Sequence, residues 1–278
     1  MGRISTRLRI FIVTFVTVLF YFFTLEAQLG KIVGLDFGLN FDLIRYLILG
    51  LLVYLGTYWA LFFKVKQERF LTILLFPSLA VMAGAFFSGL LVTYVFPIGA
   101  GQITLKLSTT MIVGLFTYIS LLTVNILNAH YLGKIPLGQA AKASYFVLSL
   151  LTSYIVYFIL LSNDFNPLIK GGVIFLFTSL IAYMTLWSIE YNRKERAIVA
   201  FAMGLLLMFG QLILAVWPIN PTYLALILNL VFYFTLNMAM EMREMLGKWI
   251  WLEYAALFIF ILLVLLILGE WGINGSLV

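Results

Sequence analysis

The stretch "RFLTILLFPSLAVMAGAFFSGLLVTYVF", residues 69–96, decides the fold class. It carries no charged residue after its first position, and it is longer than the ~20 residues that a helix needs to cross a membrane. Ala80, Gly84 and Ser88 recur every four residues and share one helix face, where small side chains let helices approach closely in lipid. Pro77 removes one backbone donor and predicts a bend in the inner half of the helix. We therefore expect a central membrane-spanning helix.

The composition extends this interpretation to the whole chain. The 278 residues are 64% hydrophobic and 10% charged, with a mean hydropathy of +1.12, whereas soluble domains are about 45–50% apolar and about 25% charged. The sequence predicts an all-α, polytopic transmembrane helical bundle that forms a single integral membrane domain over residues 1–278. The expected spans are about 9–27, 43–63, 70–96, 108–129, 143–162, 168–189, 197–217, 222–240 and 250–269.

The positive charges indicate the orientation. With a cytoplasmic N-terminus, thirteen of the 17 Lys and Arg residues fall on the inner side. The remaining four fall on the outer side: Lys31, Arg45, Lys106 and Lys170. This asymmetry follows the positive-inside rule, so we expect about nine spans, with the N-terminus cytoplasmic and the C-terminus outside. The pI of about 9.4 then reflects topology, and we expect membrane lipids as partners and no nucleic acid.

Two outer segments alternate apolar and polar residues as a β-strand does. These are "VGLDFGLNFDLI", residues 33–44, and "GQITLKLSTT", residues 101–110. Residues 33–44 and 102–108 are therefore candidates for a small outer β-ribbon, because a period of two places the apolar side chains on one face. The alternatives are separate interfacial loops, or a helix that already begins at residues 103–108. The candidate outer contact surface comprises Asp36, Asn40, Asp42 and Lys106.

The predicted spans contain no ionisable residue near their centres, where such groups are costly and usually functional. Neutral amides occur there instead, and we expect them to hydrogen-bond between helices: Asn125, Asn128, Gln211, Asn229 and Asn237. A candidate inner-face polar cluster comprises Asn125, Asn128, His130, Glu190, Asn237 and Glu253. The chain has one histidine and no cysteine, and a lone histidine makes a metal site only with the help of carboxylates, which Glu190, Glu241 and Glu253 near the inner face would have to supply. We predict no catalytic residues, no cofactor and no metal.

Several motifs resemble an uncharacterised polytopic membrane-protein family, a domain-of-unknown-function class from small-genome bacteria. They are "ERFLTILLFPSLAVMAGAFF", "NILNAHYLGKIPLGQAAKASYFVLSLLTSY" and "GQLILAVWPINPTYLALILNLVFYFTLNMAMEMRE", followed by "EYAALFIFILLVLLI". The resemblance covers roughly residues 65–270. Its most specific elements are Asn125, Asn128, the turn Lys134, Ile135, Pro136 and Leu137, and Trp217 and Pro218 followed by Pro221. It implies a bacterial cytoplasmic (inner) membrane and brings no known activity.

These observations favour a non-enzymatic integral membrane subunit or scaffold of an envelope or export assembly, with a protein partner in the membrane. The alternative is a lipid- or polyprenol-handling protein, such as a flippase-like carrier or a transferase partner, because grooves for apolar tails need no intramembrane charge. A third hypothesis is an ion-coupled transporter. It would need a polar pathway, which Gln211, Asn229 and Asn237 alone hardly supply.

Overall fold

The structure is a computed structural model. It describes residues 5–26, 41–61, 71–95, 102–132, 137–187, 191–216 and 220–244, and the single positions 256, 259, 260 and 263. Within these residues the chain is helical and contains no strand. Seven helices are long and apolar enough to cross a membrane, and Ile44–Ala60 forms a shorter apolar helix. The chain is therefore a multi-pass helical membrane protein, as its composition predicts.

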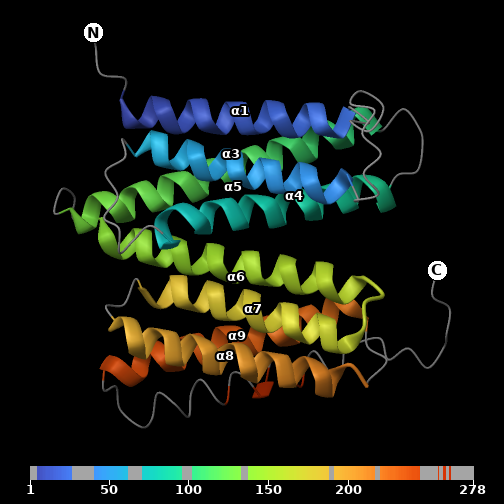
Figure 1. The fold of residues 1–278 in the computed structure, drawn as a ribbon, viewed down its shortest axis with the longest axis vertical. Coiled ribbons are helices and arrows are strands. Elements are labelled where there is room, and N and C mark those ends of the chain that lie inside the picture. Colours follow the sequence, from blue (N-terminus) through green and yellow to red (C-terminus); the bar gives the residue numbers. More distant parts are fainter. Residues whose placement is uncertain are drawn as a thin grey trace. The chain divides into compact units, whose positions relative to one another are not determined.

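The chain divides into two compact units, residues 1–148 and 149–278. Figure 1 labels the helices and colours them along the chain, from blue at the N-terminus to red at the C-terminus. The first unit holds α1 (Thr6–Glu26), α3 (Phe41–Ala60), η2 (Leu71–Leu75), α4 (Phe76–Val95), α5 (Gln102–Tyr131) and the start of α6 (Gly138–Ser162). The second unit holds the rest of α6, together with α7 (Pro167–Leu186), α8 (Arg193–Leu214) and α9 (Pro221–Glu244).

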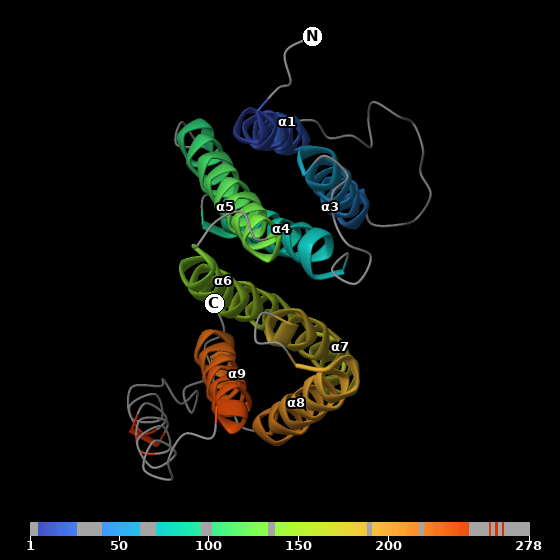
Figure 2. The same cartoon turned by 90° about the vertical axis from the view of Figure 1, so that its left-hand side faces the viewer.

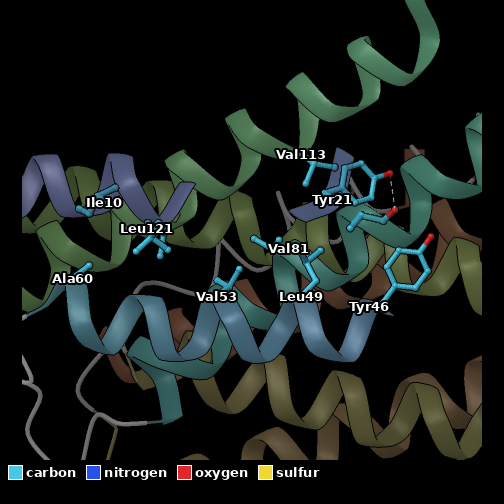
Figure 3. Packing of buried hydrophobic residues seen from close by; sticks show 11 residues of the cluster. Ile10, Tyr21, Tyr46, Leu49, Val53, Ala60, Val81, Val113 and Leu121 are labelled. Carbon is cyan, nitrogen blue, oxygen red and sulfur yellow. Dashed lines mark hydrogen bonds between the residues drawn. The ribbon is translucent and has the colours of Figure 1, made fainter. Parts of the chain in front are cut away.

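In the first unit, α4 is the central helix, with 67% of its membrane-spanning window buried. It packs against α3 and α5, and residues of α1, α3, α4 and α5 form one buried apolar cluster (Figure 3). The predicted small-residue face takes part in this packing. Ala80 is fully buried, Gly84 lies next to Phe116 of α5, and the Ser88 hydroxyl is 2.7 Å from the Tyr21 hydroxyl of α1. The Tyr21 hydroxyl, whose hydrogen bond is dashed in Figure 3, donates to the main-chain carbonyl of Ala85 at 3.2 Å.

In the second unit, α7 and α8 pack along their length, and α9 contacts both helices (Figure 2). The start of α7 follows from its sequence. Pro167 occupies the first helical turn, where its missing N–H costs nothing, and the Asn166 side chain accepts a hydrogen bond from the Leu168 amide at 2.9 Å. Further along, Gly204 of α8 allows the close approach of α7, because a side chain there would meet Phe175 and Ser179.

The conformation of residues 102–108 differs from the strand expected there. They form the start of α5, an unbroken helix from Gln102 to Tyr131, so the outer β-ribbon with residues 33–44 is wrong for this segment, and the alternative of a helix that begins at residues 103–108 is confirmed. A helix satisfies its backbone hydrogen bonds internally, which a lone strand beside lipid cannot do, and the segment runs directly into an apolar span. Residues 33–40 lie outside the described residues, and residues 41–44 are helical.

The other predicted spans, from 9–27 to 222–240, each coincide with a helix. In the span over residues 70–96, the helix does not simply bend at Pro77. A π-helical turn, η2, immediately precedes α4 and ends two residues before the proline. The ninth predicted span, 250–269, lies largely outside the described residues. The number of membrane crossings, the orientation and the single-domain organisation stay predictions.

Candidate functional site

Polar side chains on one face of α6 contact the neighbouring helices of the second unit. Ser149, Ser153 and Tyr157 are spaced four residues apart, so they lie above one another on the helix, and all three are buried or nearly so. The three contacts, here called the polar ladder, are Thr185 Oγ1 to Ser149 Oγ (2.9 Å), Ser153 Oγ to Asn229 Oδ1 (2.6 Å), and Tyr157 Oη to Thr178 Oγ1 (2.7 Å). The ladder joins α6 to α7 twice and to α9 once.

The polar ladder connects α6 with α7 and α9 through hydrogen bonds. Hydrogen bonds between membrane helices stabilise the bundle by about 0.6–2 kcal/mol each. Leaving one buried partner unsatisfied costs a similar amount or more. Asn229 behaves as the sequence predicts, because its amide oxygen accepts from a different helix. Asn237 does not, since its amide nitrogen donates to the Tyr233 carbonyl of its own helix, 2.9 Å away.

A buried arginine lies near the end of the α7–α8 hairpin. Arg196, in the first turns of α8, is only 3% exposed. Its Nη2 donates to the Tyr183 hydroxyl of α7 at 2.7 Å, and its guanidinium carbon lies 4.0 Å from the centroid of the Tyr183 ring. A cation over an aromatic face is stabilised by the ring quadrupole, and the nearby C-terminal end of α7 carries partial negative charge. Arg196 Nε is buried and has no hydrogen-bond partner within the described residues.

Two further buried polar atoms of α7 and α8 have no hydrogen-bond partner among the described residues. Ser179 Oγ lies at the close approach to Gly204, and Gln211 Oε1 faces the α7 backbone at Gly171. Gln211 is almost fully buried. The sequence predicts an inter-helix hydrogen bond for this amide, and the structure shows close packing at its oxygen instead. Arg196, Ser179 and Gln211 thus place three unpaired polar atoms in one helical hairpin.

Of the candidate outer contact surface, the structure describes the side chain of Lys106 alone, so the surface stays a prediction. Asp36 and Asn40 lie outside the described residues, and Asp42 is in the first turn of α3, where its side chain is not described. Lys106 is half-buried in α5. Since residues 102–108 are helical, Lys106 lies on a helix and not on a strand.

The candidate inner-face cluster is divided between the two units. Asn125, Asn128 and His130 belong to the last turns of α5, with Asn128 buried, whereas Asn237 belongs to α9. His130 packs on the first residue of α6, because a side chain at Gly138 would collide with the imidazole. Glu190 and Glu253 lie outside the described residues. No group of three His, Asp or Glu residues in the described part of the chain is arranged to hold a metal ion.

Sequence reasoning missed the polar ladder and the Arg196–Tyr183 pair. A signal for the ladder exists, because the spacing of Ser149, Ser153 and Tyr157 places three polar residues on one face of an apolar helix. Arg196 gives no such signal. It belongs to the basic run "NRKER" and is indistinguishable there from exposed loop cations; only the position of Tyr183 on the preceding helix explains its burial.

Comparison with known proteins leaves the chain without an assigned relative. No protein-family model, no curated protein and no solved structure matches it. The resemblance to an uncharacterised family over roughly residues 65–270 stays a prediction. A functional hypothesis therefore depends on side-chain contacts in the second unit, namely those of the polar ladder and of the buried Arg196.

Proposed function

We propose that the chain is a non-enzymatic integral membrane subunit or scaffold of an envelope or export assembly. The observation that carries this proposal is the polar ladder. A transport pathway or an active site needs polar groups that exchange their partners for a substrate. The ladder hydroxyls instead bond to neighbouring helices at 2.6–2.9 Å, deep in the second unit, which is how a bundle is held together.

The lipid-facing surfaces of the two units support the same proposal. Only 22% of the membrane-spanning window of α1 and 28% of that of α8 are buried within the chain. Both helices present apolar side chains outward, including Phe11 and Phe15 of α1 and Phe209 and Ile213 of α8. Such helices have a broad surface available to lipid or to the helices of another subunit, in line with a protein partner in the membrane.

We further propose nine spans, with a cytoplasmic N-terminus, in a bacterial cytoplasmic membrane. The distribution of Lys and Arg residues supports the orientation, and the resemblance to a bacterial family supports the membrane.

Mass spectrometry of the full chain, extracted from its own membrane in native lipid particles without detergent, tests the subunit proposal. The expected result is a second polypeptide at a fixed ratio to the chain, retained in repeated preparations. An unrelated multi-pass protein, expressed and extracted in the same way, controls for chance co-extraction. Recovery of the chain without any stoichiometric polypeptide would contradict the proposal.

One observation favours the second candidate function, lipid or polyprenol handling. Arg196 is a buried cation whose Nε has no hydrogen-bond partner among the described residues, and Phe201, five residues further along α8, is 54% exposed. A cation near the end of a span and an apolar flank together suit an amphipathic lipid. The same mass spectrometry would support this candidate if one polyprenyl or phospholipid species is retained and no polypeptide accompanies the chain.

A further inference from the structure

We propose that two arginine clasps hold α1 against α3, one at each end of this helical hairpin, and that α1 separates from α3 more readily when either clasp is removed. The Arg9 clasp is the contact of Arg9 with Trp59, and the Arg45 clasp is the contact of Arg45 with Thr24. Each arginine lies near the start of its own helix and reaches the C-terminal end of the other helix. This inference goes beyond the proposed function, because the clasps act within the chain and require no partner protein.

The Arg9 clasp closes one end of the hairpin. Arg9 is the fourth residue of α1, and its Nη1 donates a hydrogen bond to the main-chain carbonyl of Trp59 at 3.3 Å. Trp59 is the next-to-last residue of α3, and the last four carbonyls of a helix have no amide within the helix to pair with. The Arg9 guanidinium carbon also lies 5.2 Å from the centroid of the Trp59 ring, whose quadrupole attracts a cation. Arg9 therefore contacts both the main chain and the side chain of Trp59.

The Arg45 clasp is the counterpart at the opposite end. Arg45 is the fifth residue of α3, and its Nη1 donates to the main-chain carbonyl of Thr24 at 3.4 Å. Thr24 is the third residue from the end of α1, where the helix dipole favours a cation. Arg45 Nη2 donates to the Tyr46 hydroxyl at 2.9 Å, and Tyr46 belongs to the buried apolar cluster. The guanidinium is therefore oriented from two sides.

The shallow burial of α1 explains why contacts at its ends matter. Only 22% of its membrane-spanning window is buried, compared with 67% for that of α4. In Figure 3, Ile10 and Ala60 lie at one end of the buried apolar cluster, and Tyr21 and Tyr46 lie at the other. The clasp residues adjoin these positions in the sequence, so each clasp borders one end of the cluster. Apolar faces associate weakly in lipid, because the lipid chains are equally apolar, and polar contacts at the helix ends therefore contribute a large share of the attachment.

The second unit contains the same kind of contact. Lys170, the fourth residue of α7, donates from Nζ to the carbonyl of Leu161, the next-to-last residue of α6, at 3.4 Å. Arg45 and Lys170 are also two of the four cations expected on the outer side. The partial negative charge at the C-terminal end of a neighbouring helix stabilises a cation there. This contact gives both residues a structural reason to occur on the side that the positive-inside rule disfavours.

Thiol labelling at a buried position of α1 tests the clasps. The chain has no cysteine, so Thr17→Cys, at a fully buried position in the middle of α1, reports the separation of this helix from its neighbours. The full chain with this reporter is labelled with N-ethylmaleimide in mild detergent, and mass spectrometry measures the labelling rate. We expect R9Q and R45Q each to raise this rate about tenfold, as the loss of a hydrogen bond from a charged group implies. R9K and R45K, which keep the charge and a donor, should raise it less.

Arg7→Gln is the matched control, because Arg7 is an exposed arginine of the same helix. It should leave the labelling rate of Thr17→Cys unchanged. A second reporter, Ser78→Cys at a buried position of α4, distinguishes the separation of α1 from unfolding of the whole first unit, and its labelling rate should stay the same in R9Q and R45Q. The proposal is overturned if R9Q and R45Q leave the labelling of Thr17→Cys unchanged, if R7Q raises it as much as R9Q does, or if both reporters become reactive together.

Discussion

The hydroxyl of Tyr145 on α6 donates a hydrogen bond to the main-chain carbonyl of Thr72, 3.4 Å away. Thr72 belongs to the π-helical turn η2, where each carbonyl pairs with the amide five residues later. For Thr72 that residue is Pro77, which has no N–H. Tyr145 therefore supplies the donor that the proline lacks, and both Thr72 and Tyr145 are buried.

We predict that Tyr145→Phe lowers the free energy of unfolding by about 1 kcal/mol, because a buried carbonyl loses its donor. In a Pro77→Ala background, residue 77 regains an N–H that can pair with the Thr72 carbonyl. Tyr145→Phe should therefore lower the free energy of unfolding by clearly less in that background. Unfolding of the four proteins in mixed detergent micelles measures this coupling. Tyr118→Phe, at an exposed position of α5, is the control and should be neutral. If Tyr145→Phe lowers the free energy of unfolding equally in both backgrounds, the Tyr145 hydroxyl does not replace the hydrogen-bond donor that Pro77 lacks.

We predict that Gly204→Ala destabilises the second unit by about 1–3 kcal/mol, the range for overpacking a filled interior. A Cβ atom at Gly204 would lie 2.8 Å from the Phe175 carbonyl oxygen, a backbone atom that cannot turn aside. Gly172→Ala is the matched control on α7, since a Cβ there meets nothing within 4 Å. It should be neutral or slightly stabilising, because alanine has the better helix propensity. Thermal unfolding of both variants checks the prediction, which fails if Gly204→Ala is as well tolerated as Gly172→Ala.

We predict an energetic coupling of about 0.6–2 kcal/mol between Ser153 and Asn229, the rung that joins α6 to α9. Ser153→Ala, Asn229→Ala and the double variant form a double-mutant cycle, read by unfolding in mixed micelles. Asn237→Ala combined with Ser153→Ala is the control, because the Asn237 amide bonds to its own helix. If the changes in the free energy of unfolding are additive in both cycles, the Ser153–Asn229 hydrogen bond does not stabilise the bundle and the role of the polar ladder is contradicted.

The positions of the spans could be predicted from the sequence because apolar length is a local property. Residues 143–162 are long and apolar enough to cross a membrane, and α6 indeed covers them. The period of two at residues 103–108 was misleading for a physical reason. Beside lipid a helix gains little from sorting its apolar residues to one side, so Ile103, Leu105 and Leu107 alternate by chance within α5.

The contacts of the candidate site could not be predicted in the same way, because each depends on two helices. Arg196 is buried only because Tyr183 lies opposite it on α7. Similarly, Pro77 signals an irregular helix, but the hydrogen bond to the Thr72 carbonyl in the π-helical turn before it comes from Tyr145 on α6. Such contacts depend on how the helices pack against one another, and the periodicity of a single helix gives no information about that packing.

The account depends most directly on a membrane separating the α6–α7 connection from the α7–α8 connection. The chain has no cysteine, so single cysteines at the exposed positions Asp164 and Asn192 each report on one side of the membrane. Thr178→Cys, at a fully buried position of α7, is the control. Labelling of intact cells with a membrane-impermeant maleimide should modify Asp164→Cys at once. It should modify Asn192→Cys only after the membrane is opened, and Thr178→Cys only after denaturation. Equal labelling of Asp164→Cys and Asn192→Cys in intact cells would contradict the membrane-spanning bundle proposed here.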